Sequence, residues 1–357
     1  MNTTKTITLP QDANVFSPSK FFKRFFSADL AVDLGTANTL IYVKNQGIVI
    51  NEPSLVAIDK KSREIIFVGQ EAKEAIEESS KTLKAFRPLK EGVIADFTIT
   101  ISYIQRLLKK ANQKFTFFKP RIVLGIPSGV TQVEKKAIID VAMDCGASSV
   151  NLVEESMAAA LGADLPIGNP EGQMIVDIGG GTTEVAVICL NQTVYSHSIR
   201  VAGDIMDEAI QKSLRKDFGI EISISEAERI KLLIGSALPF INQRTTPIHG
   251  KDLTNGQPGK FEISDKEIRN SLQDPLASII SSIKTAIEQC SPEIASDIIN
   301  NGIYLAGGGS LLKGLSERLE REIGVNFYLT EDPLNCVAYG VGKIIDNFKE
   351  MKSLCIA

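Results

Sequence analysis

Short apolar runs broken by glycine-rich turns recur along the chain and predict strands mixed with helices. The runs 30–32 and 174–176 each lead into a turn rich in glycine and threonine and then into a second apolar run, which is typical of strand, turn and strand. Segment 303–306 predicts a further short strand, and leucines at helical spacing follow its glycines. Residues 131–134 form a capping box that predicts a helix to residue 145. The pattern predicts an α/β fold.

The strongest feature is an internal repeat. Residues 33–43 (DLGTANTLIYV) align without gaps on residues 177–187 (DIGGGTTEVAV), and the aspartate, the next glycine, a threonine and the final valine are identical. The two copies are separated by about one domain length. We therefore predict two similar lobes that face a common ligand.

The residue types in both turns suit an anion. Glycine permits positive φ, which aims successive backbone N–H groups into a concavity that binds phosphate. Hydroxyl and amide side chains add donors, and an aspartate at each strand end could hold a hydrated Mg²⁺. The residues are the glycines Gly35, Gly179, Gly180 and Gly181, the donors Thr36, Asn38, Thr182 and Thr183, and the acids Asp33 and Asp177. Each turn alone is equally consistent with an ordinary hairpin, but the matched pair favours a polyphosphate clamp.

A third glycine cluster, residues 307–309, stands between the predicted strand and the helix that follows it. Glycine at such a junction lets a flat or anionic ligand approach the backbone closely. This cluster alone is weak evidence, because many α/β turns have the same composition.

Length and composition narrow the class of protein. The chain has 357 residues, 43% of them hydrophobic, which exceeds the usual size of one core and favours two lobes. The net charge of -4, with both signs interspersed, gives no argument for nucleic acid as a partner. The five cysteines lack metal-site spacing and predict reduced thiols in a cytosolic protein. Neither an apolar run of spanning length nor a signal peptide is present, so we expect no transmembrane segment.

A series of motifs follows in a fixed order from about residue 29 to residue 343. The motifs are DLGTANT, IPSGVTQVEKKA, LVEESMAAALGADLPI, DIGGGTTEVAV, RVAGDIMDEAI, SEAERIKLLIGSA, LAGGGSLLKGL and EDPLNCVAYGVGK. In this set the chain resembles the MreB family of bacterial actins, more closely than actin, sugar kinases or chaperone ATPases. The resemblance implies an actin-like, duplicated two-lobed fold with a central nucleotide cleft. It also implies ATP and Mg²⁺ as ligands, with GTP as an open alternative, and head-to-tail protofilaments that bind membrane.

The resemblance assigns roles to single residues. Those matching the phosphate loops are Gly35, Thr36, Ala37 and Asn38 in the first and Gly179, Gly180, Gly181 and Thr182 in the second. Those matching the remaining nucleotide contacts are Gly203, the adenosine segment Glu228, Arg229, Ile230 and Lys231, and Gly307, Gly308, Gly309 and Ser310 over the base. Asp33 and Asp177 would hold the metal through water.

Glu155 matches the acid that orients the attacking water, and Thr182 matches the residue that assists it. From its position alone, Glu155 is more readily explained as a helix N-terminal acid favoured by the helix dipole, and only the family match reverses this. The chain departs from the family at Ser156, where relatives usually carry proline, and this puts the positioning of the water in doubt.

The same resemblance divides the chain into segments. They are an N-terminal extension (1–27), subdomain IA (28–58 and 96–165), subdomain IB (59–95), subdomain IIA (166–206 and 266–336), subdomain IIB (207–265) and a C-terminal return to IA (337–357).

Two phenylalanine clusters predict contact with an anionic membrane surface. A helix opened by Ser17 and Pro18 would carry phenylalanines on one face and three cations on the other. The phenylalanines of the two clusters are Phe21, Phe22, Phe25 and Phe26 in the helix and Phe115, Phe117 and Phe118 where the family is reported to carry a membrane loop. The alternatives are a terminal helix packed on its own core and a buried strand edge.

The leading function is a cytoplasmic protein, peripheral at the inner face of the cell membrane, that polymerises with ATP, hydrolyses it slowly and serves cell shape or motility. Its expected partners are further copies of itself and the membrane. A kinase of the same superfamily would need a substrate-reading segment, and none is visible. A chaperone ATPase would need a peptide-binding domain, and the chain ends at residue 357 without one.

Overall fold

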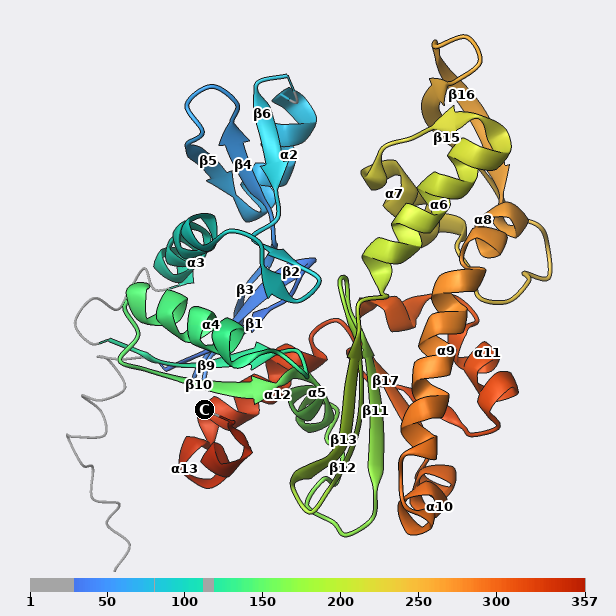
Figure 1. Ribbon diagram of the computed structural model, residues 1–357. Helices are drawn as coiled ribbons and strands as arrows, with labels where there is room; N and C mark the ends of the chain where they lie inside the picture. Colours follow the sequence, from blue (N-terminus) through green and yellow to red (C-terminus); the bar gives the residue numbers. More distant parts are fainter. Residues whose placement is uncertain (1–28, 80, 112–118, 357) are drawn as a thin grey trace, which may run out of the picture.

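Two five-stranded sheets with the same strand order form the framework of the molecule (Figure 1). The computed structural model describes residues 29–79, 81–111 and 119–356. The first sheet has the order β10 (Ser149–Glu154), β9 (Arg121–Ile126), β1 (Leu30–Leu34), β2 (Asn38–Val43), β3 (Gly47–Pro53). The corresponding strands of the second sheet, read in the same direction, are β18 (Phe327–Leu329), β17 (Ile303–Ala306), β11 (Gln173–Ile178), β12 (Thr183–Cys189), β13 (Gln192–Ile199). We call the halves built on these sheets lobe I and lobe II.

The pairing of the strands repeats as well. In each sheet the glycine-rich hairpin and the next strand are antiparallel, and the two remaining strands are parallel to the first. A register shift lies between Ile41 and Tyr42 in one sheet and between Val187 and Ile188 in the other. The eleven-residue repeat of the sequence is therefore the visible part of a duplicated sheet, and the predicted α/β fold is confirmed.

Side chains of the central strands alternate between two cores. Leu30 and Val32 pack with α3 (Phe97–Ala111) and α4 (Gln132–Asp144), whereas Ala31 enters a core that also receives Ile175 from the other sheet. This shared core contains α5 (Glu155–Gly162) and α12 (Cys336–Asp346), which lie between the sheets. The helices with residues in the core of lobe II are α6 (Gly203–Phe218), α7 (Ile224–Ile234), α8 (Asp265–Ser271), α9 (Gln273–Glu288), α10 (Pro292–Asn301) and α11 (Leu315–Ile323).

The helices α5 and α12 cross with their backbones in contact. A Cβ added to Gly162 would overlap the Cys336 carbonyl, and one added to Gly340 would overlap the Ala158 carbonyl. Glycine is therefore required on each helix for this approach. The crossing joins the two lobes beneath the cleft described below.

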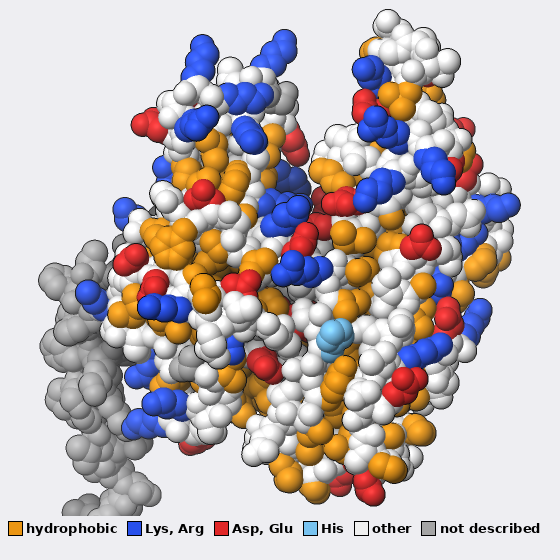
Figure 2. Space-filling model, in the orientation of Figure 1, with side chains coloured by type: hydrophobic (Ala, Val, Ile, Leu, Met, Phe, Trp, Pro, Cys, Tyr) orange, Lys and Arg blue, Asp and Glu red, His pale blue; other side chains and the backbone are white. Residues whose placement is uncertain are grey.

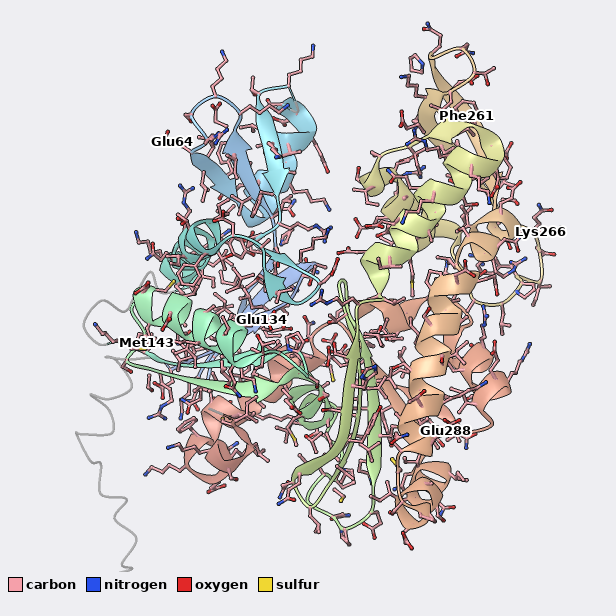
Figure 3. All side chains as sticks on the ribbon, viewed as in Figure 1. Glu64, Glu134, Met143, Phe261, Lys266 and Glu288 are labelled. Atoms are coloured by element: carbon pink, nitrogen blue, oxygen red, sulfur yellow. The ribbon has the colours of Figure 1, made fainter. Side chains whose placement is uncertain are left out.

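Each lobe carries a small three-stranded sheet at the same end of the molecule. The strands are β5 (Ile65–Val68), β4 (Val56–Asp59) and β6 (Leu83–Phe86), with α2 (Gly69–Ser79), on lobe I, and β14 (Ile220–Glu221), β15 (Thr245–Asp252) and β16 (Pro258–Ser264) on lobe II. We call each small sheet, with the helix packed on it, an arm. Glu64 lies on the arm of lobe I and Phe261 on the arm of lobe II (Figure 3). The short strands β7 (Leu89–Lys90) and β8 (Val93–Ile94) pair at the base of the lobe I arm, and α13 (Phe348–Met351) and the turn Lys352–Leu354 end the chain.

The capping box at Thr131 is confirmed, with Glu134 bonding back to the cap, and Gly146 follows the helix at a φ of +99°. The prediction that a helix begins directly after the third glycine cluster is wrong. A 3₁₀ turn, Gly308–Leu311, comes first, because Gly314 adopts a left-handed conformation and α11 begins only after it. Among the described residues, no helix combines the length and apolar character needed to span a lipid bilayer. All the phenylalanines of both predicted membrane clusters lie outside the described residues.

Candidate functional site

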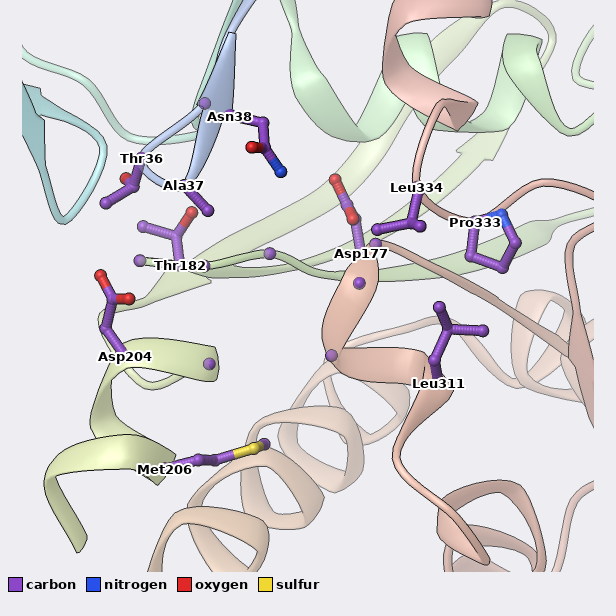
Figure 4. A pocket seen from close by; sticks show the side chains of 18 of the residues that line it. Thr36, Ala37, Asn38, Asp177, Thr182, Asp204, Met206, Leu311, Pro333 and Leu334 are labelled. Atoms are coloured by element: carbon purple, nitrogen blue, oxygen red, sulfur yellow. The ribbon is translucent and has the colours of Figure 1, made fainter. Parts of the chain in front are cut away.

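A cleft of about 450 Å³ lies between the lobes, below the notch that separates the arms in Figure 2. Its floor is formed by the two glycine-rich hairpins, β1–β2 of lobe I and β11–β12 of lobe II. Because both hairpins come from the centre of their sheets, the duplication brings the same turn to the cleft from opposite sides. Figure 4 shows Thr36, Ala37 and Asn38 facing Thr182 and Asp177 across this floor.

The hairpins touch at their glycines. A Cβ at Gly180 would lie 2.8 Å from Ala37 Cβ, and one at Gly181 would lie 2.5 Å from Thr36 Oγ1. None of the glycines 35 and 179–181 adopts positive φ, so the expectation that these positions need left-handed backbone is wrong. Gly180 and Gly181 are glycine because the opposite hairpin occupies the space of a side chain, whereas a Cβ at Gly35 or Gly179 would meet a backbone carbonyl of its own hairpin. In the third cluster only Gly307 has positive φ, +78°.

Backbone hydrogen bonds fix both turns. In the first, Ser54 N–H donates to Ala37 O at 2.8 Å, and Ser54 Oγ donates to Gly35 O at 2.6 Å. In the second, Asp204 N–H donates to Gly180 O at 2.8 Å. This last bond attaches the start of α6 to the second hairpin, so the turns are held before any ligand arrives.

Acidic side chains gather at the floor, and no Lys or Arg of the described residues contributes to the pKa shifts of Asp33, Glu155 or Asp177. Burial raises the pKa of Asp33 to about 7 and that of Asp177 to about 8, and the charges of Asp33 and Glu184 add to the shift of Asp177. Burial, then the charges of Glu184, Asp33 and Asp177, raises the pKa of Glu155 well above its usual range. The carboxylates therefore favour a positively charged group in the cleft.

Glu184 differs from the other three acids because its oxygens are already bonded. It accepts the Ser128 N–H of lobe I at 2.9 Å and the Ser198 hydroxyl at 2.5 Å, while burial raises its pKa. Ser156, next to Glu155 in α5, is fully buried, and its hydroxyl has no hydrogen-bond partner among the described residues.

The far end of the cleft is lined by leucine and proline side chains beside one partly charged helix face. Helix α7 presents Glu228, Lys231, Leu232 and Gly235 to it at helical spacing, and Leu311, Pro333 and Leu334 face it from the other side (Figure 4). Lys231 is held in place by Asp207 at 2.8 Å and by the Gly203 carbonyl at 2.9 Å. An elongated ligand with an anionic end and a flat apolar end would match the two ends of the cleft.

Most of the predicted site residues line this cleft. They are Asp33, Gly35, Thr36, Ala37, Asn38, Glu155, Asp177, Gly179, Gly180, Gly181, Thr182, Gly203, Glu228, Lys231, Gly307, Gly308 and Gly309. Four predicted contacts do not; one of them, Thr183, is buried and its hydroxyl donates to the Val201 carbonyl at 2.7 Å. Arg229 turns away to Glu226 at 2.7 Å, and Ile230 is buried in the core, because these positions lie on the other faces of α7. The Ser310 hydroxyl is buried against the Gly307 carbonyl at 2.6 Å.

Sequence reasoning missed several lining residues. They are Asp204, Met206, Asp207, Leu232, Leu311, Leu312, Lys313, Pro333, Leu334 and Val337. Helical spacing from Glu228 could have found Leu232. The residues of 333–337 carry no comparable signal, because they enter the cleft from a part of the chain remote from both hairpins.

Comparison with known proteins identifies close relatives. The family model described as MreB/Mbl protein matches residues 27–353. The cell shape-determining protein MreB of Escherichia coli (strain K12) is 48% identical over 332 residues, covering 92% of this chain and 96% of that protein. The cell shape-determining protein Mbl of Bacillus subtilis (strain 168) is 40% identical, with 91% and 98% covered.

Solved structures agree with the sequence relatives. The crystal structure of MreB5 of Spiroplasma citri bound to ADP superposes with a TM-score of 0.86 at 36% identity, covering 92% of this chain and 98% of that one. The same protein bound to AMPPNP gives a TM-score of 0.85. These structures share the actin-like fold.

Proposed function

Because the chain belongs to the MreB/Mbl family, we propose that it binds ATP in this cleft, hydrolyses it slowly, and assembles into membrane-associated filaments that serve cell shape or motility. The observation that carries the proposal is the meeting of the two glycine-rich hairpins over a group of buried acids. A polyphosphate lying between the hairpins would contact both lobes at once, so binding would depend on how the lobes are placed.

The nucleotide is proposed to lie with its phosphates at the hairpins and its base at the end lined by leucine and proline side chains. Glu228 and Lys231 of α7, which line the cleft, are the proposed contacts of the ribose, and Gly308, Leu311 and Leu334 are proposed to cover the base. The S. citri relative binds ADP and AMPPNP, which supports an adenine nucleotide here. GTP is the alternative that a competition experiment would test.

Mg²⁺ fits the floor of the cleft. Asp33 and Asp177 are the residues that would hold it, and the raised pKa of each is what a carboxylate without its cation would show. The described residues offer no cluster of three direct metal ligands, which suits an ion that keeps several waters and binds largely through them. When bound, the ion would neutralise phosphate charge and lower the pKa of both acids.

Glu155 is the proposed residue for orienting the attacking water, with Thr182 assisting it. Glu155 begins α5 at the cleft floor and lies among acids whose charges raise its pKa. A cation nearby would favour its ionised form, which is the form that can accept a proton or a hydrogen bond from water. Binding of Mg²⁺ with the nucleotide would therefore favour the ionised form of Glu155 that hydrolysis needs.

The experiment compares Glu155→Gln with its matched neighbour Glu154→Gln. Loss of a general base lowers a rate by roughly a hundredfold or more. Glu155→Gln should reduce phosphate release by this amount and leave ATP affinity within about threefold, because a water-orienting group acts mainly in the transition state. Glu154 does not line the cleft, so Glu154→Gln should release phosphate normally. Equal rates in wild type and Glu155→Gln would remove Glu155 from the mechanism.

The same assay separates a polymer from a kinase. Phosphate release without any acceptor, together with ATP-dependent sedimentation, would support the filament. Release that depends on an added small-molecule acceptor, with no sedimentation, would favour the kinase.

Membrane association is proposed to reside in the predicted N-terminal helix and the loop that contains Phe117 and Phe118. Burial of one phenylalanine contributes roughly 1.5–3 kcal/mol, and one basic residue near an anionic leaflet about 1 kcal/mol. A filament repeats these anchors in every subunit, so attachment should strengthen steeply on assembly. Deletion of residues 1–27 should reduce sedimentation with anionic vesicles and leave ATP binding intact. Undiminished sedimentation would leave the loop as the sole candidate.

A further inference from the structure

The turn of residues 87–92 joins lobe I to lobe II at the mouth of the cleft through two ion pairs. Arg87 Nη1 lies 3.1 Å from each carboxylate oxygen of Asp204, in the first turn of α6. Glu91, four residues further along, lies 3.3 Å from Arg200, four residues before Asp204. Each side carries an arginine followed four residues later by an acid, and the two segments run in opposite directions, so each group faces its opposite. Figure 2 shows basic and acidic side chains meeting where the arms approach each other.

The same turn touches both glycine-rich hairpins. The Gly92 N–H donates to Thr36 Oγ1 at 3.2 Å. Gly92 has a φ of +75°, and a Cβ there would lie 3.3 Å from Thr182 Cγ2 and 2.7 Å from the ring of Pro127. Thr36 belongs to the first hairpin and Thr182 to the second. A change in what the hairpins hold would therefore reach the turn by direct contact.

Lobe II holds its side of the contact firmly. Besides the bond from Asp204 N–H, the Gly203 N–H donates to the Gly179 carbonyl at 3.2 Å, so the start of α6 moves with the second hairpin. On the opposite side of the cleft, the lobes are joined by the crossing of α5 and α12. One side is thus closed by packed backbone and the other by side-chain ion pairs. The ion pairs can separate without unfolding either lobe.

We propose that Arg87 and Glu91, with Asp204 and Arg200, form a latch that controls how fast a nucleotide leaves the cleft; this rests on the proposed function. The side chains of Arg87 and Asp204 are 40% and 34% exposed. Ion pairs of this kind are individually weak and are screened by salt. A weak latch opens often enough for exchange and encloses the phosphates between openings. Release should therefore become faster at high salt.

The test is the dissociation rate of a fluorescent ATP analogue from the full-length chain, chased with excess ATP. Arg87→Gln and Asp204→Asn should each accelerate release roughly two- to fivefold, the effect of losing one exposed pair. The charge exchange Arg87→Asp with Asp204→Arg should return the rate toward that of the wild type. Lys90→Gln is the matched control, because Lys90 lies in the same turn and, among the described residues, its one ion pair is a long contact of 3.9 Å from its Nζ to Glu91 Oε1 within that turn. It should release the analogue at the wild-type rate.

Two results would overturn the latch. One is a release rate equal to wild type in both single variants. The other is an exchanged variant in which the single effects simply add, which would mean that Asp204 acts on the ligand from the cleft wall. Affinity of the wild type is measured first: failure to bind rejects the proposed function, whereas normal binding with unchanged release rejects only the latch. Salt should accelerate release from wild type more than from Arg87→Gln, and equal acceleration would also count against it.

Discussion

The two lobes are copies that differ most where they touch. Positions 36 and 37 of the first hairpin correspond to positions 180 and 181 of the second, and the structure places them crosswise, with Ala37 against Gly180 and Thr36 against Gly181. At each of these two contacts, a side chain from both copies would claim the same space. One copy therefore carries Thr and Ala, and the other carries two glycines. The two copies of the repeat therefore differ in sequence at these positions because they pack against each other.

The same rule holds at the crossing of α5 and α12, but there it is solved differently. Gly162 meets the Cys336 carbonyl and Gly340 meets the Ala158 carbonyl, so each helix supplies one glycine. At the hairpins all the space is given up by lobe II, whereas at the crossing each of the two helices contributes a glycine. The contrast can be tested by placing one methyl group at each contact.

The largest effect is expected at the helix crossing. Gly340→Ala places a Cβ on the Ala158 backbone, which cannot move aside as a side chain could. Overpacking of a buried contact costs about 1–3 kcal/mol and occasionally more, and backbone overlap belongs at the upper end. The free energy of unfolding in urea should fall accordingly. Tyr339→Ala, on the exposed face of the same helix, should cost less than about 1 kcal/mol, and equal losses in both variants would refute the packing argument.

At the hairpins the methyl group can be exchanged between lobes. Gly180→Ala should weaken ATP binding about tenfold to a hundredfold, because its Cβ would meet the Cβ of Ala37 at 2.8 Å and part the hairpins. Ala37→Gly should bind within about threefold of wild type, and the double variant should recover much of the loss. Calorimetric titration with ATP measures all three. A double variant as weak as Gly180→Ala would show that the two positions are not coupled.

The paired aspartates give a pH test of the two lobes. Their folded pKa values, about 7 for Asp33 and about 8 for Asp177, lie above the usual value, so the folded state holds protons that the unfolded state releases. Without nucleotide or divalent cation, stability should therefore fall by a few kcal/mol as the pH rises from about 5 to 8, because each proton held only by the folded state contributes about 1.4 kcal/mol per pH unit. Asp177→Asn should flatten this fall up to pH 8, and Asp33→Asn only up to pH 7. Identical urea-unfolding profiles in all three proteins would contradict the shifts.

The smallest effect is expected at Ser156 of α5, whose buried hydroxyl has no hydrogen-bond partner among the described residues. Ser156→Ala removes a buried hydroxyl without a partner and improves helix propensity, so the free energy of unfolding should rise by about 1 kcal/mol. Ser278→Ala is a matched control, because its hydroxyl donates to the Asp274 carbonyl on an exposed helix face. A loss of stability in Ser156→Ala would show that this hydroxyl has a partner, such as a buried water.

The sequence foretold the two lobes and most of the cleft because the repeat is local and its glycines are adjacent. It led to the wrong reason for those glycines, since at Gly180 and Gly181 the neighbour that fills the Cβ space belongs to the other copy. Arg229 and Ile230 do not line the cleft, because the prediction took a contiguous segment and only one face of α7 meets the cleft. The Arg87–Asp204 contact spans 117 positions and involves charged residues of ordinary appearance, so only the folded chain could reveal it.

The crossing of α5 and α12 also has a mechanical consequence. It lies between the two large sheets, whereas the arms extend to one end of the molecule (Figure 1). Any rotation about a fulcrum moves distant points in proportion to their lever arm. A tilt that barely shifts the backbones at Gly162 and Gly340 would swing the two arm tips through a much larger arc. The displacement of the arm tips that follows from a small tilt at the crossing is therefore set by the distance between the crossing and the tips.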